Sequence, residues 1–359
     1  MVMMIIAKVC ARRLAPAALC LWMATSVECF GARSVANDEM VLSQILFGSC
    51  IKQDKPMPIL NTIVAQKPDL FLFLGDNIYA DTSDMAVMQK KYDLLKSDLG
   101  FAALVNGFPT MATWDDHDYG VNDGGAEYPQ RRAAQKMFVD FWDDAPDSPR
   151  RKRAGVYEAR IFGPQGKRVQ VIMLDTRYFR GPLKKGERRT GGPYYPNPDP
   201  SVTLLGDEQW KWLEDQLREP AELRIVGSSI QCISEAAGQE TWSNLPLERE
   251  RFFQLIKTTR ANGVVIISGD RHWSELSRID ENMPYPIYDF TSSSLNQIHP
   301  RGTPTENRFR AMSKTFHKEN FGRIRIDWSQ SNPRIQMDIL DMEGGVQLGK
   351  RLNLSDLGS

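Results

Sequence analysis

The residues best suited to chemistry lie in three short motifs that combine Asp with Tyr or His: GDNIY at residues 75–79, WDDHD at residues 114–118 and SGDRH at residues 268–272. The chain contains only four histidines, and two of them lie beside carboxylates in these motifs. Hard cations bind carboxylate oxygens, whereas imidazole suits iron or zinc. These residue types, brought together from separate loops, predict a metal site.

The elements that must position these motifs are buried strands. Residues 70–74 (LFLFL) are a run of large apolar side chains, which is typical of a strand covered on both faces, and Gly75 lets the chain turn sharply after it. Residues 263–268 form a second apolar run that ends on Gly-Asp. Ligands of open α/β sheets bind at the carboxyl ends of strands. Asp76 could instead cap a following helix, but the recurrence of the pattern favours a site.

Residues 45–50 (ILFGSC) repeat the arrangement with a cysteine in place of the carboxylate. A buried, inert thiol is the usual role of a lone cysteine, whereas the position of Cys50 at a strand end favours a ligand. The chain has five cysteines, and Cys10, Cys20 and Cys29 lie in or beside the N-terminal segment. Only Cys50 and Cys232 are expected in the mature chain, so no disulfide framework is predicted.

Length and charge bound the class of protein. The chain has 359 residues, is 42% hydrophobic and has a formal net charge of zero, which allows one large domain or two ordinary ones. Neutrality argues against a nucleic-acid partner, because binding to a phosphate backbone needs an excess of Lys and Arg. It also gives no general electrostatic attraction to membranes.

The N-terminus is typical of a targeting segment. Lys8, Arg12 and Arg13 precede an apolar stretch at residues 14–27 that is short for a transmembrane helix. We therefore predict a signal peptide at residues 1–36, an extracytoplasmic mature protein and no stable membrane span. A retained apolar N-terminal helix or strand is the alternative.

The remaining chain alternates between helical and strand patterns, without an internal repeat or a linker, which predicts one domain over residues 37–359. The sequence predicts helices at residues 56–67, 85–104, 131–142, 205–217 and 246–259, and further strands at residues 169–174, 223–230, 285–292, 321–328 and 334–340. The basic run at residues 150–153 is interpreted as a solvated turn. The Gly- and Pro-rich stretch at residues 176–203 is either a substrate-covering flap or a solvated loop.

In chain order, the motifs GSC, GDNIY, WDDHD and SGDRH resemble those of the alkaline phosphatase D, or PhoD-like, family of calcineurin-like metallophosphoesterases. LDTR at residues 174–177 and GSSIQ at residues 227–231 add to the resemblance, which covers residues 47–272. It implies an α/β fold, a four-layer α/β/β/α sandwich of two mixed sheets, with a dinuclear or multinuclear metal centre at the strand ends.

The resemblance also implies roles for single residues. Asp76 matches a bridging carboxylate, and the ligands of a ferric ion, Fe(3+), match Cys50, Tyr79 and His272. Asp116 and Asp270 stand where Asn and His of the wider superfamily bind the second metal, and an oxygen-rich site of Asp76, Asp116 and Asp270 favours a hard divalent ion such as Ca(2+).

Three further residues near these ligands carry expected roles. His117 falls at the catalytic histidine of the wider superfamily. Ser229 or Gln231 lies near a further second-metal ligand. Arg271 would stabilise charge on phosphoryl oxygens or make a surface salt bridge.

The expected function is hydrolysis of a phosphate ester by a water activated at two metals. One alternative is a phosphodiesterase or phospholipase-like activity at the same site. Another is a non-catalytic protein that binds phosphate compounds, which predicts the loss of a ligand or of His117. Of the other histidines, His299 either lines the pocket or lies on the surface, which is the favoured interpretation, and His317 has no assigned role.

Overall fold

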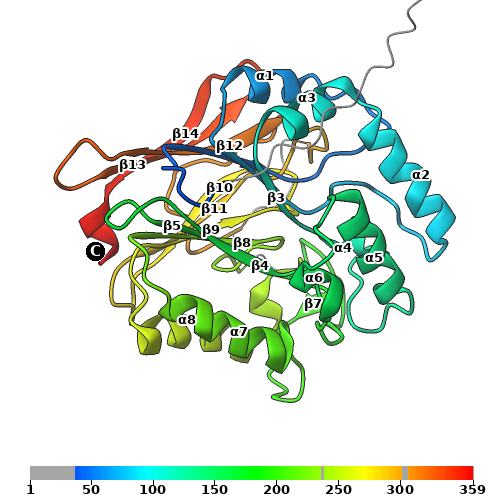
Figure 1. Ribbon diagram of the computed structural model, residues 1–359. Helices are drawn as coiled ribbons and strands as arrows, with labels where there is room; N and C mark the ends of the chain where they lie inside the picture. The colour runs from blue at the N-terminus through cyan, green and yellow to red at the C-terminus, as the bar shows by residue number, and fades with distance from the viewer. Residues whose placement is uncertain (1–36, 236–237, 301–305, 359) are drawn as a thin grey trace, which may run out of the picture. The chain divides into compact units, whose positions relative to one another are not determined.

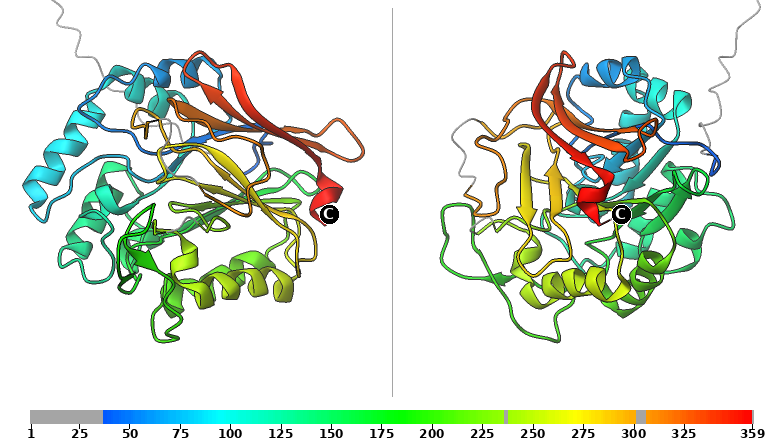
Figure 2. Two further views of the ribbon diagram at one scale, coloured as in Figure 1. Left: turned by 180° about the vertical axis from the view of Figure 1, so that it is seen from behind. Right: turned by 90° about the vertical axis from the view of Figure 1, so that its left-hand side faces the viewer.

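Two six-stranded sheets stack face to face in the computed structural model, which describes residues 37–235, 238–300 and 306–358 (Figure 1). Helices cover the outer face of each sheet, and Figure 2 shows the same four layers from two further sides. The predicted α/β class and four-layer α/β/β/α sandwich are therefore confirmed. The described residues belong to one unit, residues 33–359.

The first sheet combines parallel strands from the N-terminal part of the chain with an antiparallel meander from its C-terminal end. Its order is β14-β13-β12-β1-β2-β3, and β1, β2 and β3 run parallel to one another. Its strands are β1 (Gln44–Gly48), β2 (Leu70–Leu74), β3 (Thr110–Thr113), β12 (Asn320–Asp327), β13 (Arg334–Asp341) and β14 (Val346–Asn353).

The second sheet is also mixed, with order β10-β11-β9-β8-β5-β4. Its four inner strands are parallel, and the edge strands β4 and β10 pair antiparallel with their neighbours. Its strands are β4 (Glu158–Phe162), β5 (Val169–Met173), β8 (Leu223–Ser228), β9 (Val264–Ser268), β10 (Glu275–Ile279) and β11 (Ile287–Thr291).

The outer layers differ in origin. The first sheet is covered by α1 (Ile59–Ala65), α2 (Met85–Lys96) and α3 (Leu99–Gly107), and the second by α7 (Gly206–Arg218) and α8 (Pro246–Thr259) (Figure 1). The shorter or peripheral elements are α4 (Asp116–Tyr119), α5 (Arg131–Phe141), α6 (Pro149–Lys152), β6 (Lys184–Lys185), β7 (Tyr194–Tyr195), η1 (Trp242–Asn244) and η2 (Leu354–Leu357).

Strand β2 shows why its sequence is apolar throughout. Leu72 and Leu74 belong to the core between the sheets, whereas Phe71 and Phe73 belong to the core under the helices of the first sheet. Successive side chains of a strand point to opposite faces, so a strand covered on both sides needs an apolar residue at every position. The buried strand predicted at residues 70–74 is confirmed.

Some predicted elements differ from the structure. The helix predicted at residues 85–104 is two helices, because the Asp98 side chain accepts a hydrogen bond from the Phe101 amide at 2.9 Å and starts α3 separately. The prediction of a solvated turn at residues 150–153 is wrong for Arg150, because this side chain is buried and pairs with Asp144 and Glu158. The stretch at residues 176–203 contains the small hairpin β6–β7.

The predicted signal peptide at residues 1–36, with Cys10, Cys20 and Cys29, lies outside the described residues. Within the part of the chain that the structure describes, no helix is both long and apolar enough to cross a lipid bilayer.

Candidate metal centre

Loops from both sheets meet at the carboxyl ends of β1, β2, β3 and β9. Cys50, Asp76 and His272 each place a potential ligand atom within 4.8 Å of the others. Asp76 belongs as well to a second group within the same limit, which comprises Asp76, Asp115, Asp116 and Asp270. The structure thus brings together residues from four distant motifs, and Asp76 belongs to both of these groups.

The backbone is unusual at four of these residues. Cys50, Asp76, Asp270 and His272 have φ angles of 60°, 51°, 66° and 58°, in the left-handed region that residues other than glycine rarely occupy. Such strain persists where the surrounding structure enforces it, and it concentrates at functional sites. Gly75 precedes Asp76 at φ 100°, and a Cβ there would lie 2.6 Å from the Asp115 backbone nitrogen. Glycine at this position lets the GDNIY and WDDHD loops touch.

Cys50, Tyr79 and His272 surround one oxygen of Asp76. The Asp76 Oδ2 atom lies 3.4 Å from Cys50 Sγ and 3.2 Å from the Tyr79 hydroxyl, which itself lies 2.9 Å from His272 Nε2. Burial and the Asp76 charge raise the pKa of both Cys50 and Tyr79. Burial, followed by the His299 and Arg271 charges, lowers the pKa of His272 to about 3, so this imidazole is neutral and able to bind a metal.

The oxygen-rich group contains buried carboxylate oxygens without a partner. Asp115 Oδ1 accepts hydrogen bonds from Ser229 Oγ and Arg177 Nε, each at 2.6 Å. Among the described residues, Asp115 Oδ2 and Asp76 Oδ1 are buried and have no hydrogen-bond partner. Buried polar atoms are normally satisfied, and an uncompensated buried carboxylate is costly. A bound cation would satisfy both atoms, so the residues present fit a metal centre.

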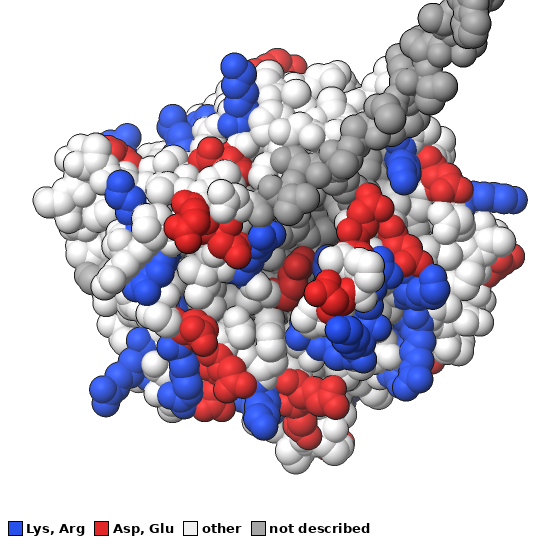
Figure 3. Space-filling model, in the orientation of Figure 1, with Lys and Arg blue, Asp and Glu red and all other residues white. Residues whose placement is uncertain are grey.

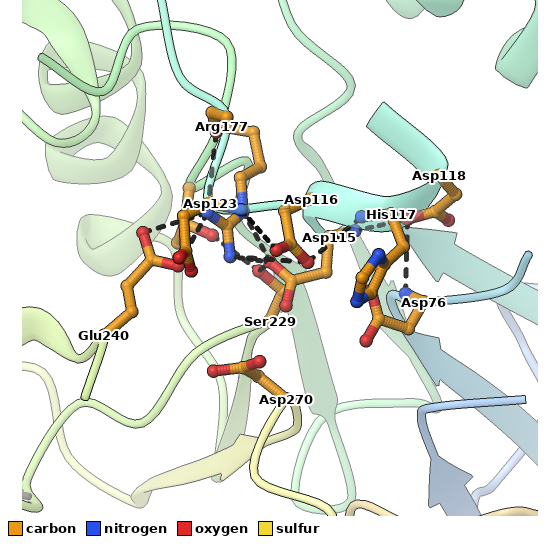
Figure 4. Close-up of polar contacts among 12 residues, drawn as sticks. Asp76, Asp115, Asp116, His117, Asp118, Asp123, Arg177, Ser229, Glu240 and Asp270 are labelled. Atoms are coloured by element: carbon orange, nitrogen blue, oxygen red, sulfur yellow. Dashed lines mark hydrogen bonds and ion pairs between the residues drawn. The ribbon is translucent and has the colours of Figure 1, made fainter. Parts of the chain in front are cut away.

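Arg177 places a positive charge beside this group. It is fully buried, and its guanidinium lies 2.5 Å from Asp115 and 2.8 Å from Glu240 (Figure 4). Burial raises the pKa of Asp115 to about 7, against the opposing effect of Arg177. Burial also acts to raise the pKa of Asp116, but Arg177 and His117 outweigh it and lower that pKa.

Asp118 ties the two acidic loops together. Its Oδ1 accepts hydrogen bonds from the backbone amides of Asp115 at 2.6 Å and Asp76 at 3.2 Å, and its Oδ2 accepts one from Asn77 Nδ2 at 2.6 Å. Asp118 is buried and does not belong to either group of potential ligands. It therefore fixes the relative position of Asp76 and Asp115.

His117 lies beside the shared carboxylate and is oriented by Asp81. Its Nδ1 is 2.7 Å from Asp81 Oδ1, and its ring centroid lies 4.2 Å from that of Tyr79. Burial acts to lower the pKa of His117, but the Asp76 and Asp81 carboxylates raise it to about 10. In the metal-free chain this imidazole is therefore protonated at neutral pH and able to donate a proton.

Seven of the eight residues predicted for the site offer a potential ligand atom to these groups or contact the Asp76 carboxylate: Cys50, Asp76, Tyr79, Asp116, His117, Asp270 and His272. The eighth, Arg271, is buried and pairs with the carboxylate of its neighbour Asp270. The salt bridge of the alternative prediction is therefore present but buried, and a role on phosphoryl oxygens stays a prediction. Ser229 contacts Asp115, whereas Gln231 donates to Glu275 and Thr291 away from the carboxylates.

The other histidines differ in their relation to the centre. His299 is exposed, as expected, yet its ring centroid lies 4.6 Å from that of His272 at the edge of the centre. His317 instead stacks on Trp273 at 5.8 Å.

Sequence reasoning missed Asp81, Asp115, Asp118 and Glu240. Asp115 and Asp118 stand in the WDDHD motif, but the motif alone does not say which of its three carboxylates face the cluster. Asp81 follows the GDNIY motif by two residues, and Glu240 lies in no motif. Their contacts arise only when separate loops fold together.

The sequence of this chain is similar to those of known phosphatases. The sequence model of a family described as "PhoD-like phosphatase" matches residues 45–341. The chain belongs to this family. Alkaline phosphatase D of Bacillus subtilis (strain 168) is 25% identical over 262 residues, which are 60% of this chain and 43% of that protein. The chain therefore spans less than half the length of this curated relative.

Two solved structures share the fold. A structure described as "Structure of PhoD" has a TM-score of 0.66 and 20% identity, and the match covers 89% of this chain and 70% of that one. A structure described as "GAP50 the anchor in the inner membrane complex of Plasmodium" has a TM-score of 0.55 and 15% identity, with 88% and 89% of the chains covered. At these identities the two structures support the fold alone.

Proposed function

We propose that this protein is a metal-dependent phosphoester hydrolase whose active site is the cluster around Asp76. The observation that carries the proposal is the shared position of Asp76. One of its oxygens faces Cys50 and Tyr79, and its other oxygen is buried with no hydrogen-bond partner among the described residues. The same carboxylate belongs to the group that contains Asp115, Asp116 and Asp270. Asp76 is therefore placed so that it would be a ligand in both groups if each held a cation.

The two halves of the cluster suit different metals. Cys50, Tyr79 and His272 would hold a ferric ion with Asp76, because thiolate and phenolate stabilise trivalent iron. Asp76, Asp116 and Asp270 would hold a hard divalent ion, for which we propose calcium. When bound, the two cations supply a Lewis-acid pair that clamps a phosphate ester and lowers the pKa of water.

His117 is the proposed general acid. Asp81 holds its Nδ1 at 2.7 Å, which leaves Nε2 to give a proton to the leaving oxygen of the ester. The Tyr79 ring packs against the imidazole and limits its rotation. Arg271, held by Asp270, supplies a nearby positive charge for the phosphoryl oxygens.

The site supports monoester and diester hydrolysis alike, and a phosphodiesterase or phospholipase-like activity is the alternative within the same chemistry. Fold alone does not guarantee catalysis. The retention of every predicted ligand and of His117 favours an enzyme over a protein that only binds phosphate compounds.

The test measures hydrolysis of an aryl phosphate monoester and of a bis-aryl diester by the purified chain, before and after metal removal with a chelator. We expect activity that chelation abolishes and added metal restores, and the ratio of the two rates identifies the preferred ester. Asp76→Asn should be inactive in both assays, whereas the exposed Asp54→Asn is the matched control. An Asp76→Asn protein with full activity would rule out this site.

Export of the protein is part of the proposal and is supported by the sequence alone. The charged and then apolar N-terminus is expected to be cleaved between about residues 27 and 37. Sequencing the N-terminus of protein from an extracytoplasmic fraction tests this, and an intact Met1 in cytosolic protein would contradict it.

A further inference from the structure

A basic pocket lies between α5 and the segment at residues 150–154. It has a volume of about 500 Å³. One wall is a single face of α5, formed by residues 132, 135, 136 and 139, which helical spacing places side by side. The opposite wall is residues 150–154, and Tyr178 completes the lining.

The charge of the lining is one-sided, because six of its residues are basic and none is acidic: Arg132, Lys136, Arg150, Arg151, Lys152 and Arg153. Basic side chains gather on this face of the molecule over α5 and α6 (Figure 3). The pocket is therefore more than a scatter of surface lysines.

Three of the six cations are already committed to carboxylates outside the lining. Lys136 and Arg151 each lie 2.5 Å from Asp140, and Arg150 lies 2.5 Å from Asp144 and 2.8 Å from Glu158. These ion pairs fix the walls of the pocket. Their three cations and three carboxylates cancel, so they add no net charge to it.

The other three cations have no carboxylate partner within the described part of the chain. Arg132 and Lys152 are exposed side chains without an ion pair. Arg153 lies 3.7 Å above the Tyr157 ring, and its Nε is buried without a hydrogen-bond partner. These three groups give the pocket an uncompensated positive charge.

Hydrogen bonds from one side chain of α5 to the backbone of the opposite wall hold the two walls of the pocket in place. Gln135 Nε2 donates to the carbonyls of Arg150 and Arg153 at 2.7 Å and of Gly155 at 3.1 Å. Gln135 Oε1 accepts the Gly155 amide at 3.1 Å. One buried side chain thus fixes the distance between the two walls.

We propose that this pocket is an anion site, separate from the candidate metal centre, that binds a phosphate group. Guanidinium groups match phosphate oxygens in pairs, and Lys adds a point charge. The phosphate would come either as inorganic phosphate or as part of a chain of several phosphates, which the volume also admits. The proposal does not rest on the phosphoesterase activity.

The test titrates the full chain, with its metals as purified, with inorganic phosphate in a calorimeter. Arg132→Ala combined with Lys152→Ala should weaken one class of phosphate site by at least roughly tenfold, because each charge-assisted hydrogen bond is worth about that factor or more. Both side chains are exposed, so the variant should melt like the parent. Lys90→Ala combined with Lys96→Ala removes the same charge from exposed positions on α2 and is the matched control.

The control variant should keep every class of phosphate site. The proposal is overturned if the pocket variant binds phosphate as tightly as the parent, or if the control loses as much affinity. Phosphate bound at the metal centre is retained in both variants, so the test also works with a protein that has no phosphatase activity.

A second titration with tripolyphosphate separates the two sources. Tighter binding than inorganic phosphate, lost in the pocket variant, identifies a chain of phosphates. Equal binding identifies a single phosphate group.

Discussion

Replacing Asp81 by Asn tests whether His117 acts as an oriented acid. Asp81 Oδ1 lies 2.7 Å from His117 Nδ1, so the substitution replaces a charged acceptor by a neutral amide at the same place. A hydrogen bond to a charged group contributes about 1.5–3 kcal/mol. The Asp81 side chain is 45% exposed, and solvent screening places the loss at the lower end of this range. If the interaction acts in the transition state, kcat should fall by about tenfold.

The assay is steady-state hydrolysis of an aryl phosphate, together with metal analysis of the same samples. We expect a lower kcat, an almost unchanged KM and unchanged metal content for Asp81→Asn. His117→Gln should lower kcat by about 10²- to 10⁴-fold, the usual contribution of a positioned acid. Adding Asp81→Asn to His117→Gln should cost little more, because the two residues act as one unit.

Asp84→Asn is the matched control, since Asp84 lies on the same loop and caps α2 without contacting His117. Asn is also a good N-cap, so stability and kcat should stay close to those of the parent. The reasoning is refuted if Asp81→Asn has the parental kcat, or if it loses metal, which would make Asp81 part of the metal site.

The remaining predictions concern iron, the buried arginine and pH. Phenolate and thiolate ligands should make the natively purified protein coloured, and both Tyr79→Phe and Cys50→Ser should weaken or shift the visible absorption in folded protein; a colourless, fully active parent would contradict the iron proposal. Arg177→Met leaves the buried carboxylates of Asp115 and Glu240 without their cation and should lower the free energy of unfolding by about 3–5 kcal/mol. Arg150→Met, the control, should cost a similar amount but should leave calcium binding unchanged, whereas Arg177→Met should alter it. Equal calcium affinities of the two variants in a titration would show that Arg177 is purely structural. Burial raises the pKa of both Asp115 and Asp118 to about 7, so near neutral pH the folded metal-free chain binds more protons than the unfolded chain. The folded state therefore loses stability as the pH rises through about 7. The chelated protein should melt at a lower temperature at about pH 8 than at about pH 6.5, and a higher melting temperature at pH 8 would contradict the raised pKa values. His117, with a pKa raised to about 10, acts in the same direction. His272, with a pKa lowered to about 3, acts weakly in the opposite direction, because its imidazole in the unfolded chain is still half protonated at its ordinary pKa near 6.5.

The central strands were predictable because their environment leaves a strong local signal. Residues 70–74 and 264–268 are buried on both faces, and only unbroken apolar runs satisfy that. The edge strands β4 and β14 were missed, because an edge strand with a half-exposed face carries charged residues such as Arg160 and Lys350. The split between α2 and α3 depends on one cap, Asp98, in a sequence that otherwise favours helix.

The site was predictable as far as its residues stand in motifs at strand ends. The sequence places Asp76, His117 and His272 there, and the fold brings them together. The motifs could not reveal the contact between Asp81 and His117 or the ion pair between Glu240 and Arg177. Glu240, for example, lies more than sixty residues after Arg177 in the chain. Such contacts depend on how loops pack and not on local spacing.

Metal analysis of the natively purified chain, combined with its rate on an aryl phosphate, tests the central claim most directly. The proposed active site predicts at least two metal ions per chain, one of them iron, and it predicts that Asp76→Asn loses both the metals and the activity, because Asp76 is shared by the two groups of ligands. Full activity in a chain from which all metal has been removed, or in metal-poor Asp76→Asn protein, would contradict it.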